Sequence, residues 1–204
     1  MQEKLMSHIG LSFPSNFSDQ IIERYRNELF VDKLNLQIRK VPFGGPYASM
    51  GWTLPTLIGV YILKPYFEEF LKGMAKDHYE ILKNWLKKVS LETRCIEIVS
   101  LNAEKSENKL DNSNSQSKVF SIQSQTNLGQ PIKFLFDERF SSESWNIGIN
   151  NALDLLASNF ANGKTDELTI EIKNNNLEKT IYARLKNEKG EWEFLDSKKL
   201  VNKI

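Results

Sequence analysis

Hydrophobic and polar residues recur along this chain with two different periods, and each period predicts a different kind of element. Apolar residues three or four positions apart form one helical face and predict three helices. The first covers about residues 18–30, with Ser18 as its N-cap. The second carries the apolar stripe Phe67–Val89, and the third carries the stripe Trp145–Phe160. Both long helices therefore have one face suited to packing on a sheet.

A period of two predicts strands that bury one face and expose the other to water. This alternation occurs in Leu34–Ile38, Arg94–Leu101, Val119–Gln125, Ile132–Phe136, Leu168–Ile172, Ile181–Leu185 and Trp192–Phe194. Strands with one polar face are typical of antiparallel sheets. The sequence therefore predicts an α+β fold, in which two long amphipathic helices pack on one face of a mainly antiparallel sheet and an N-terminal helix is added.

No charged or proline-rich linker divides the chain, so residues 1–204 are expected to form a single α+β domain. Residues 1–17 are expected to be an irregular arm. Residues 102–117 contain one large apolar residue, Leu110. Such a segment buries too little apolar surface to offset the entropy lost on ordering, so a mobile loop is expected there.

The segment Val41–Leu63 has no charged residue, although 26 % of the chain is charged. Its apolar end, Leu54–Leu63, predicts a helix that is apolar almost all round. Burial in the protein's own core would explain this composition. A helix on a sheet needs only one apolar stripe, however, so the excess indicates a second buried surface. Prolines and glycines interrupt the segment, so a transmembrane helix is not expected.

Aromatic side chains concentrate between residues 52 and 70, which suits a protein interface or an interfacial membrane anchor as well as an ordinary core. The candidate interaction surface consists of Trp52, Leu54, Leu57, Ile58, Tyr61, Ile62, Tyr66 and Phe67. Its expected partner is another protein or a second copy of the chain, and a membrane surface is the alternative.

Candidate catalytic and metal-binding side chains are few. His78 lies on an apolar stripe, which favours a core histidine over a general base, and its neighbour Asp77 points about 100° away on a helix. The single Cys95 excludes an internal disulfide and fits a reducing compartment, so a cytoplasmic location is expected. Gly44–Pro46 matches no phosphate-binding loop. No catalytic, cofactor-binding or metal-binding residue and no small-molecule ligand is predicted.

The formal net charge of +1 gives no support for nucleic-acid binding. The expected function is a non-catalytic protein-interaction or accessory module that uses residues 52–70. A conditional membrane-associating effector that uses the same segment is the first alternative. An enzyme whose site cannot be read from the sequence is the second.

Overall fold

The computed structural model describes residues 7–41, 56–73, 76–94, 116–162 and 165–196. The strands are β1 (Ile9–Pro14), β2 (Leu36–Val41), β3 (Ile58–Ile62), β4 (Gln116–Gln125), β5 (Pro131–Asp137), β6 (Ile181–Leu185) and β7 (Trp192–Leu195). The helices are α1 (Asp19–Leu29), α2 (Leu71–Gly73), α3 (Lys76–Arg94), α4 (Ser142–Asn162) and α5 (Glu167–Asn174). A π-helical turn, η2 (Tyr66–Phe70), directly precedes α2.

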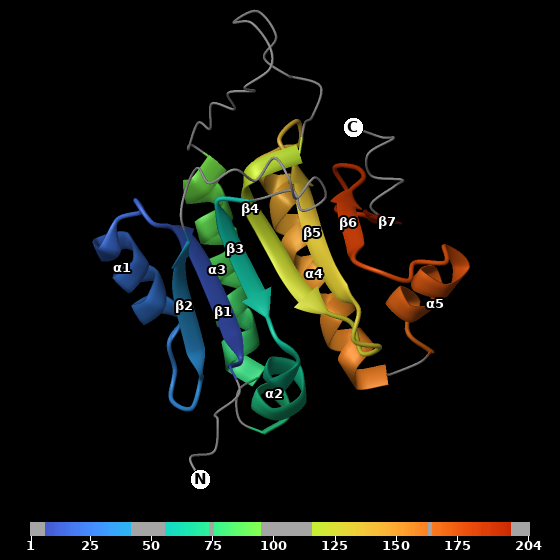
Figure 1. Cartoon of the computed structure of the whole chain (residues 1–204), viewed down its shortest axis with the longest axis horizontal. Helices are drawn as coiled ribbons and strands as arrows, with labels where there is room; N and C mark the ends of the chain where they lie inside the picture. The colour runs from blue at the N-terminus through green and yellow to red at the C-terminus, as the bar shows by residue number, and fades with distance from the viewer. Residues whose placement is uncertain (1–6, 42–55, 74–75, 95–115, 163–164, 197–204) are drawn as a thin grey trace, which may run out of the picture.

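Within the described residues, seven strands form one sheet, in the order β2-β1-β3-β4-β5-β6-β7. Figure 1 shows α3 and α4 together behind the central strands, with α1 beside the β1–β2 side and α5 beyond β6. The covered sheet face and the helices share one large hydrophobic cluster that includes Phe134 and Trp145. The predicted α+β class, with two long helices on one sheet face, is confirmed.

The sheet is mixed rather than mainly antiparallel, which corrects the predicted strand direction. β1 pairs with β2 in parallel, as do β3 with β4 and β5 with β6. The other three pairings, β1–β3, β4–β5 and β6–β7, are antiparallel. Each parallel pair is joined by a helical crossover, which parallel neighbours require. A period of two reports which face is buried and not which way a strand runs, so the sequence pattern could not reveal this.

Several predicted elements agree with the structure. The helix expected over 18–30 is α1, and the helix with the stripe Trp145–Phe160 is α4. The strands expected over Val119–Gln125 and Ile132–Phe136 are β4 and β5, which form a hairpin whose turn contains Gly129 with φ of +85°. β6 and β7 also lie where alternation predicts them. These elements have either a long helical stripe or turn residues that define both ends.

The apolar segment Leu54–Leu63, predicted as a helix, contains strand β3 instead. Ile58, Val60 and Ile62 are fully buried, and β3 lies between β1 and β4. A short apolar run is compatible with a buried helix or a buried strand, and its β-branched residues favour the strand. The position of β3 in the middle of the sheet accounts for the apolar character of residues 58–62.

Residues Leu168–Ile172, predicted as a strand, belong to helix α5. The two end residues of this range are buried on one side of the helix, whereas Ile170 is 48 % exposed. The side chain of Asp166 caps the helix by accepting a backbone N–H from its first turn. Three apolar residues at every second position are compatible with a strand and with a helix, and the N-cap at Asp166 favours the helix.

The expected irregular arm over 1–17 contains β1, because Ile9, Leu11 and Phe13 alternate with small residues and are buried. The stripe Phe67–Val89 extends over η2 and α3 rather than one continuous helix. Arg94, expected to begin a strand, ends α3. Residues 95–115, which include most of the predicted strand and loop, lie outside the described residues, and positions 116 and 117 already belong to β4.

Candidate functional site

An open groove beside β7 is the candidate functional site, with a volume of about 810 Å³. Helices α4 and α5 form two of its sides, and the β6–β7 hairpin forms the third. Its lining residues are Asn151, Asp154, Leu155, Ser158, Glu167, Glu171, Asn175, Lys186 and the range 190–195. A concave surface that combines apolar and polar groups is the usual form of a binding site.

Gly190 fixes the β6–β7 hairpin against α4. It has φ of +74°, and a Cβ atom there would lie 2.6 Å from Ile147 Cγ2 and 2.9 Å from the backbone nitrogen of Gly148. Asn151 Nδ2 also donates a hydrogen bond to the carbonyl oxygen of Gly190 (3.0 Å). Only glycine accepts both this conformation and this close approach. One side of the groove is therefore held in place by packing against the helix.

A buried polar network fixes the α5 side of the groove. The fully buried Asn159 donates from Nδ2 to Asp166 Oδ1 (2.9 Å) and Thr169 Oγ1 (3.1 Å). Its Oδ1 accepts the backbone N–H of Asn127 (2.7 Å). Burial acts to raise the pKa of Asp166, but the hydrogen bonds from Thr169 and Asn159 outweigh it and lower that pKa. Asn159 uses both its amide groups in this network, so α5 has a defined position relative to α4 and the β4–β5 turn.

The groove is acidic. Its lining contains one lysine, Lys186, and the five carboxylates of Asp154, Glu167, Glu171, Glu191 and Glu193. From outside the groove, Lys83 binds the first of these carboxylates (2.8 Å) and Arg184 binds the last (3.0 Å). Glu167 and Glu171 have no cation within ion-pair distance among the described residues. The negative charge left over therefore lies on α5.

Apolar side chains lie beside these carboxylates. Trp192, Phe194 and Leu155 are half-buried and line the groove. Trp192 packs edge-on against Phe134 and Phe136, with ring centroids 5.0 and 5.4 Å apart. Its Nε1 is buried without a hydrogen-bond partner in the described part of the chain. The groove can therefore offer apolar contacts and negative charge to the same ligand.

The predicted interaction surface over residues 52–70 is divided between core and surface. The side chains of Ile58, Ile62, Tyr66 and Phe67 are buried. Leu57 is half-buried and Tyr61 is 36 % exposed, whereas Trp52 and Leu54 lie outside the described residues. Among the candidate residues that the structure describes, only Leu57 and Tyr61 therefore leave part of their side chains exposed.

His78, the histidine of the apolar stripe, belongs to α3 and connects this helix to the end of α1. It is 2 % exposed, and its Nε2 lies 2.9 Å from the carbonyl oxygen of Leu29 at the end of α1. Its Nδ1 lies 3.1 Å from Tyr66 Oη. Burial lowers the pKa of His78, an effect that the hydrogen bond to Leu29 partly offsets. Both ring nitrogens are therefore engaged within the core.

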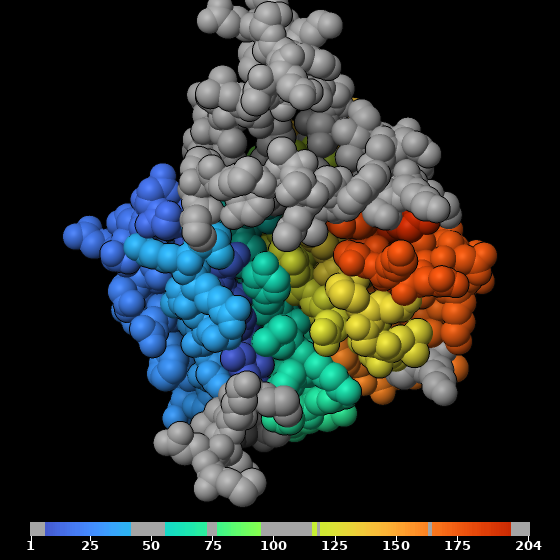
Figure 2. Space-filling view, viewed as in Figure 1, coloured from blue at the N-terminus to red at the C-terminus, as the bar shows by residue number. Residues whose placement is uncertain are grey.

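The sheet face opposite the helices is lined mainly by small and polar side chains, and Figure 2 looks onto it. One cross-strand row contains Gly10, Tyr61, Gln123, Lys133, Tyr182 and Leu195. Lys133 is 8 % exposed, and burial lowers its pKa to about 8. A desolvated lysine is a candidate nucleophile. Both Lys133 and Tyr182 have interaction partners, however, so neither is a free group.

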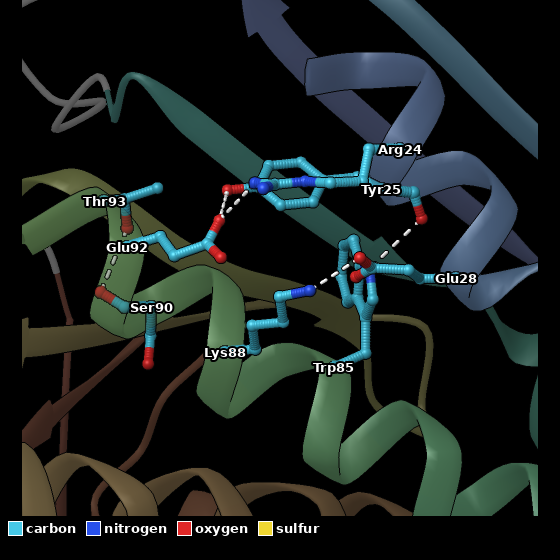
Figure 3. A network of polar contacts seen from close by, with 8 residues as sticks. All are labelled: Arg24, Tyr25, Glu28, Trp85, Lys88, Ser90, Glu92 and Thr93. Carbon is cyan, nitrogen blue, oxygen red and sulfur yellow. Dashed lines mark hydrogen bonds and ion pairs between the residues drawn. The ribbon is translucent and has the colours of Figure 1, made fainter. Parts of the chain in front are cut away.

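A second polar cluster joins α1 to α3 (Figure 3). Glu92 Oε2 accepts hydrogen bonds from Arg24 Nη2 and Tyr25 Oη, both at 2.6 Å. Lys88 and Glu28 form a second ion pair between the same helices. We call these residues the α1–α3 clip. Each charge in the clip has an opposite charge beside it, so these four side chains carry no net charge.

No protein-family model, curated protein or solved structure matches this chain. Within the described ranges, no three His, Cys, Asp or Glu side chains are grouped so that they could hold a metal ion. In the same ranges, no helix has both the length and the apolar character needed to cross a membrane.

The groove does not follow from the sequence pattern, in which the residues of α5 alternate as a strand would. As a strand, Glu167 and Glu171 would be part of a polar face, whereas on a helix they are one turn apart on the same side. The sequence did contain a signal for the helix: Asp166 is followed three residues later by Thr169, whose backbone N–H it caps.

Proposed function

We propose that this protein is a non-catalytic protein-interaction module and that it binds a segment of a partner protein in the groove beside β7. The observation that carries the proposal is that one rigidly built groove combines apolar side chains with two carboxylates, Glu167 and Glu171, that have no cationic partner among the described residues. Charged residues that a fold does not neutralise itself are available to a partner and give specificity.

The rigidity of the groove supports this function. Close packing at Gly190 holds the β6–β7 hairpin against α4, and the hydrogen bonds of Asn159 hold α5. A preformed surface loses little conformational entropy on binding, which leaves more of the contact energy for affinity. A cytoplasmic location, suggested by the single Cys95, is part of the same proposal.

A peptide selection tests the proposal. Random dodecapeptides displayed on phage are selected on the wild-type protein, and the enriched peptides are synthesised and titrated by fluorescence anisotropy. The double variant Glu167→Lys/Glu171→Lys should weaken binding by at least tenfold. The matched control, Glu23→Lys/Glu68→Lys, has the same net charge, changes exposed sites on α1 and η2, and should bind like the wild type. Equal affinity for both double variants, or no enriched peptide, would contradict the proposal.

The alternatives that use residues 52–70 remain predictions. Partner binding or membrane association through this segment would involve Tyr61, Leu57 and the residues outside the described ranges. Liposome flotation of the wild type and Tyr61→Glu tests the membrane alternative, which requires lipid binding that the substitution weakens. For the enzymatic alternative, the group of interest is Lys133. Its pKa of about 8 means that a larger fraction of its amine is uncharged near neutral pH than for an ordinary lysine.

A further inference from the structure

Strand β7 is an outer strand of the sheet in the described part of the chain. β7 pairs with β6 on one side, and the groove lies beside it. Lys186 N–H donates to the carbonyl oxygen of Glu191 (2.8 Å), so this pair is hydrogen-bonded. Hydrogen-bonded pairs alternate along an antiparallel ladder. Trp192 and Phe194 therefore direct their backbone N–H and C=O groups away from β6 and towards the groove side.

The sequence of β7 does not protect this edge in the usual way. Proteins often place lysine or proline on an edge strand, or cover it, to prevent pairing with another strand. The four residues of β7 are Trp, Glu, Phe and Leu. Their outward backbone groups can hydrogen-bond to an added strand, which is a common way for a sheet to bind an extended peptide.

We infer that the groove beside β7 binds an extended cationic peptide, which pairs with the backbone of Trp192 and Phe194 and extends the sheet. This inference rests on the proposed function and specifies its ligand. Side chains alternate on an added strand. Apolar side chains on one face would lie near Trp192, Phe194 and Leu155, and the cationic side chains would approach the carboxylates that line the groove.

Charge selects the occupant. Glu193 on β7 and Glu191 directly before it pair with Arg184 and Lys186 (3.0 and 3.9 Å), so they contribute little uncompensated charge. Glu167 and Glu171 on α5 add to the negative potential and have no cation near them among the described residues. A cationic strand would neutralise the carboxylates of Glu167 and Glu171 and relieve their mutual repulsion, whereas a second β7, with the sequence Trp-Glu-Phe-Leu, would add a negative charge.

A second copy of the chain could offer its other outer strand, β2, which carries Arg39 and Lys40. That strand would bring α1 and a whole layer of helices towards α5, which flanks the groove. A free peptide needs only the width of one strand, about 4.8 Å from β7. The geometry therefore favours a peptide segment over self-assembly.

The direct test is fluorescence anisotropy with a labelled dodecapeptide of alternating lysine and valine. The corresponding peptide of alternating glutamate and valine is the charge control and should bind at least tenfold more weakly. Two further lysine–valine peptides are N-methylated, one at every lysine and the other at every valine. Strand addition requires the N–H groups of one of these two sets, so one methylated peptide should lose at least tenfold in affinity.

A pair of variants tests the same backbone contact from the protein side. Phe194→Pro removes an N–H that points away from β6, a position where an edge strand tolerates proline. Phe194→Ala removes the same phenyl ring and keeps the N–H. The proline variant should bind at least tenfold more weakly than the alanine variant, with unchanged circular dichroism. If the proline variant does not fold, the methylated peptides decide the question.

The outcomes separate this inference from the proposed function. If the lysine–valine peptide binds, is weakened by Glu167→Lys/Glu171→Lys and is insensitive to both methylations, the groove binds peptides but strand addition is wrong. If selected peptides bind the groove but are not cationic, the inferred ligand is wrong and the proposed function stands. If the wild type assembles with increasing concentration in sedimentation velocity and Phe194→Pro prevents this, a second copy is the occupant and the inference is overturned.

Discussion

The α1–α3 clip and the groove beside β7 are both polar, but their charges are arranged in opposite ways. In the clip, Arg24 lies 2.6 Å from Glu92 and Lys88 pairs with Glu28, so each charge is matched across the two helices. In the groove, carboxylates outnumber cations, and those of Glu167 and Glu171 have no cation beside them within the described ranges.

The two regions are also held together differently. The clip joins its helices through side chains that are partly exposed, which contribute little to stability. The groove is held by buried packing at Gly190 and by the buried Asn159 network, while Glu167 and Glu171 have no cation beside them among the described residues. Charge therefore joins structural elements in one region and is left available in the other. This difference predicts which substitutions change stability and which change binding.

The largest effect on stability is expected from Gly190→Ala, which should lower the free energy of unfolding by about 3 kcal/mol. The added Cβ would lie 2.6 Å from Ile147 Cγ2, at a residue whose φ is +74°. Gly129→Ala is the control, because Gly129 also has a positive φ but no atom lies within 4 Å of the new Cβ. It should cost about 1 kcal/mol. Urea denaturation measures both, and equal losses would show that the hairpin does not depend on packing against α4.

Acid should destabilise the α1 side of the molecule. Burial lowers the pKa of His78, so the unfolded chain, with a histidine pKa of about 6.5, takes up a proton more readily than the folded protein. The contribution of His78 to stability is therefore present above pH 6.5 and is lost as the pH falls below it. Burial also lowers the pKa of His8, an effect that the charge of Glu69 partly offsets.

The test compares the free energy of unfolding at pH 7.5 and pH 5.5. The wild type should lose stability over this range, and His78→Gln should lose less because one titrating group is absent. A matched variant, His8→Gln, measures the share of the other histidine. If neither substitution reduces the loss, the pH dependence has another origin.

A smaller effect is expected within the clip. Tyr25→Phe removes the hydrogen bond to Glu92 and keeps the buried ring against Phe13 and Trp85, so it should cost about 1 kcal/mol. Glu28→Gln breaks the ion pair with Lys88 and should cost less than about 0.5 kcal/mol, with a loss that shrinks in 0.5 M salt. If Tyr25→Phe is neutral in urea denaturation, the clip does not hold α1 to α3.

The sequence predicted the elements whose pattern is long and whose ends are marked. The stripe Trp145–Phe160 extends over most of α4, and Gly129 marks the β4–β5 turn. Short apolar runs were ambiguous because several structures share their pattern. Residues 58–62 formed a central strand instead of a helix, and Leu168–Ile172 formed a helix instead of a strand. Strand direction depends on the crossovers, which no local pattern records.

The candidate groove could not be predicted because its residues come together only in the folded chain. Asp154, Glu171 and Glu193 belong to α4, α5 and β7 and are separated by up to 39 residues. An accurate assignment of α5 would have placed Glu167 on the same helix side as Glu171. It would not have placed that side next to β7, which depends on the packing at Gly190 and on the Asn159 network.

The smallest effect on stability is expected where the proposed effect on binding is large. Glu167 and Glu171 are one helical turn apart and repel each other. Glu171→Gln removes this repulsion and retains an oxygen that can accept the hydrogen bond from Asn175 Nδ2 (3.0 Å). The free energy of unfolding should therefore change by less than about 0.5 kcal/mol, with no loss of stability at low salt. The same substitution should weaken binding of the lysine–valine peptide.

Stability and binding are measured on the same sample, by urea denaturation and by fluorescence anisotropy. Glu28→Gln in the clip is the matched control, because it removes the same charge and should slightly lower stability without changing peptide affinity. If Glu171→Gln destabilises the protein as Glu28→Gln does, the carboxylates of α5 are structural and the contrast between the two regions fails. If it leaves stability intact and weakens binding, the carboxylate of Glu171 serves the partner rather than the fold.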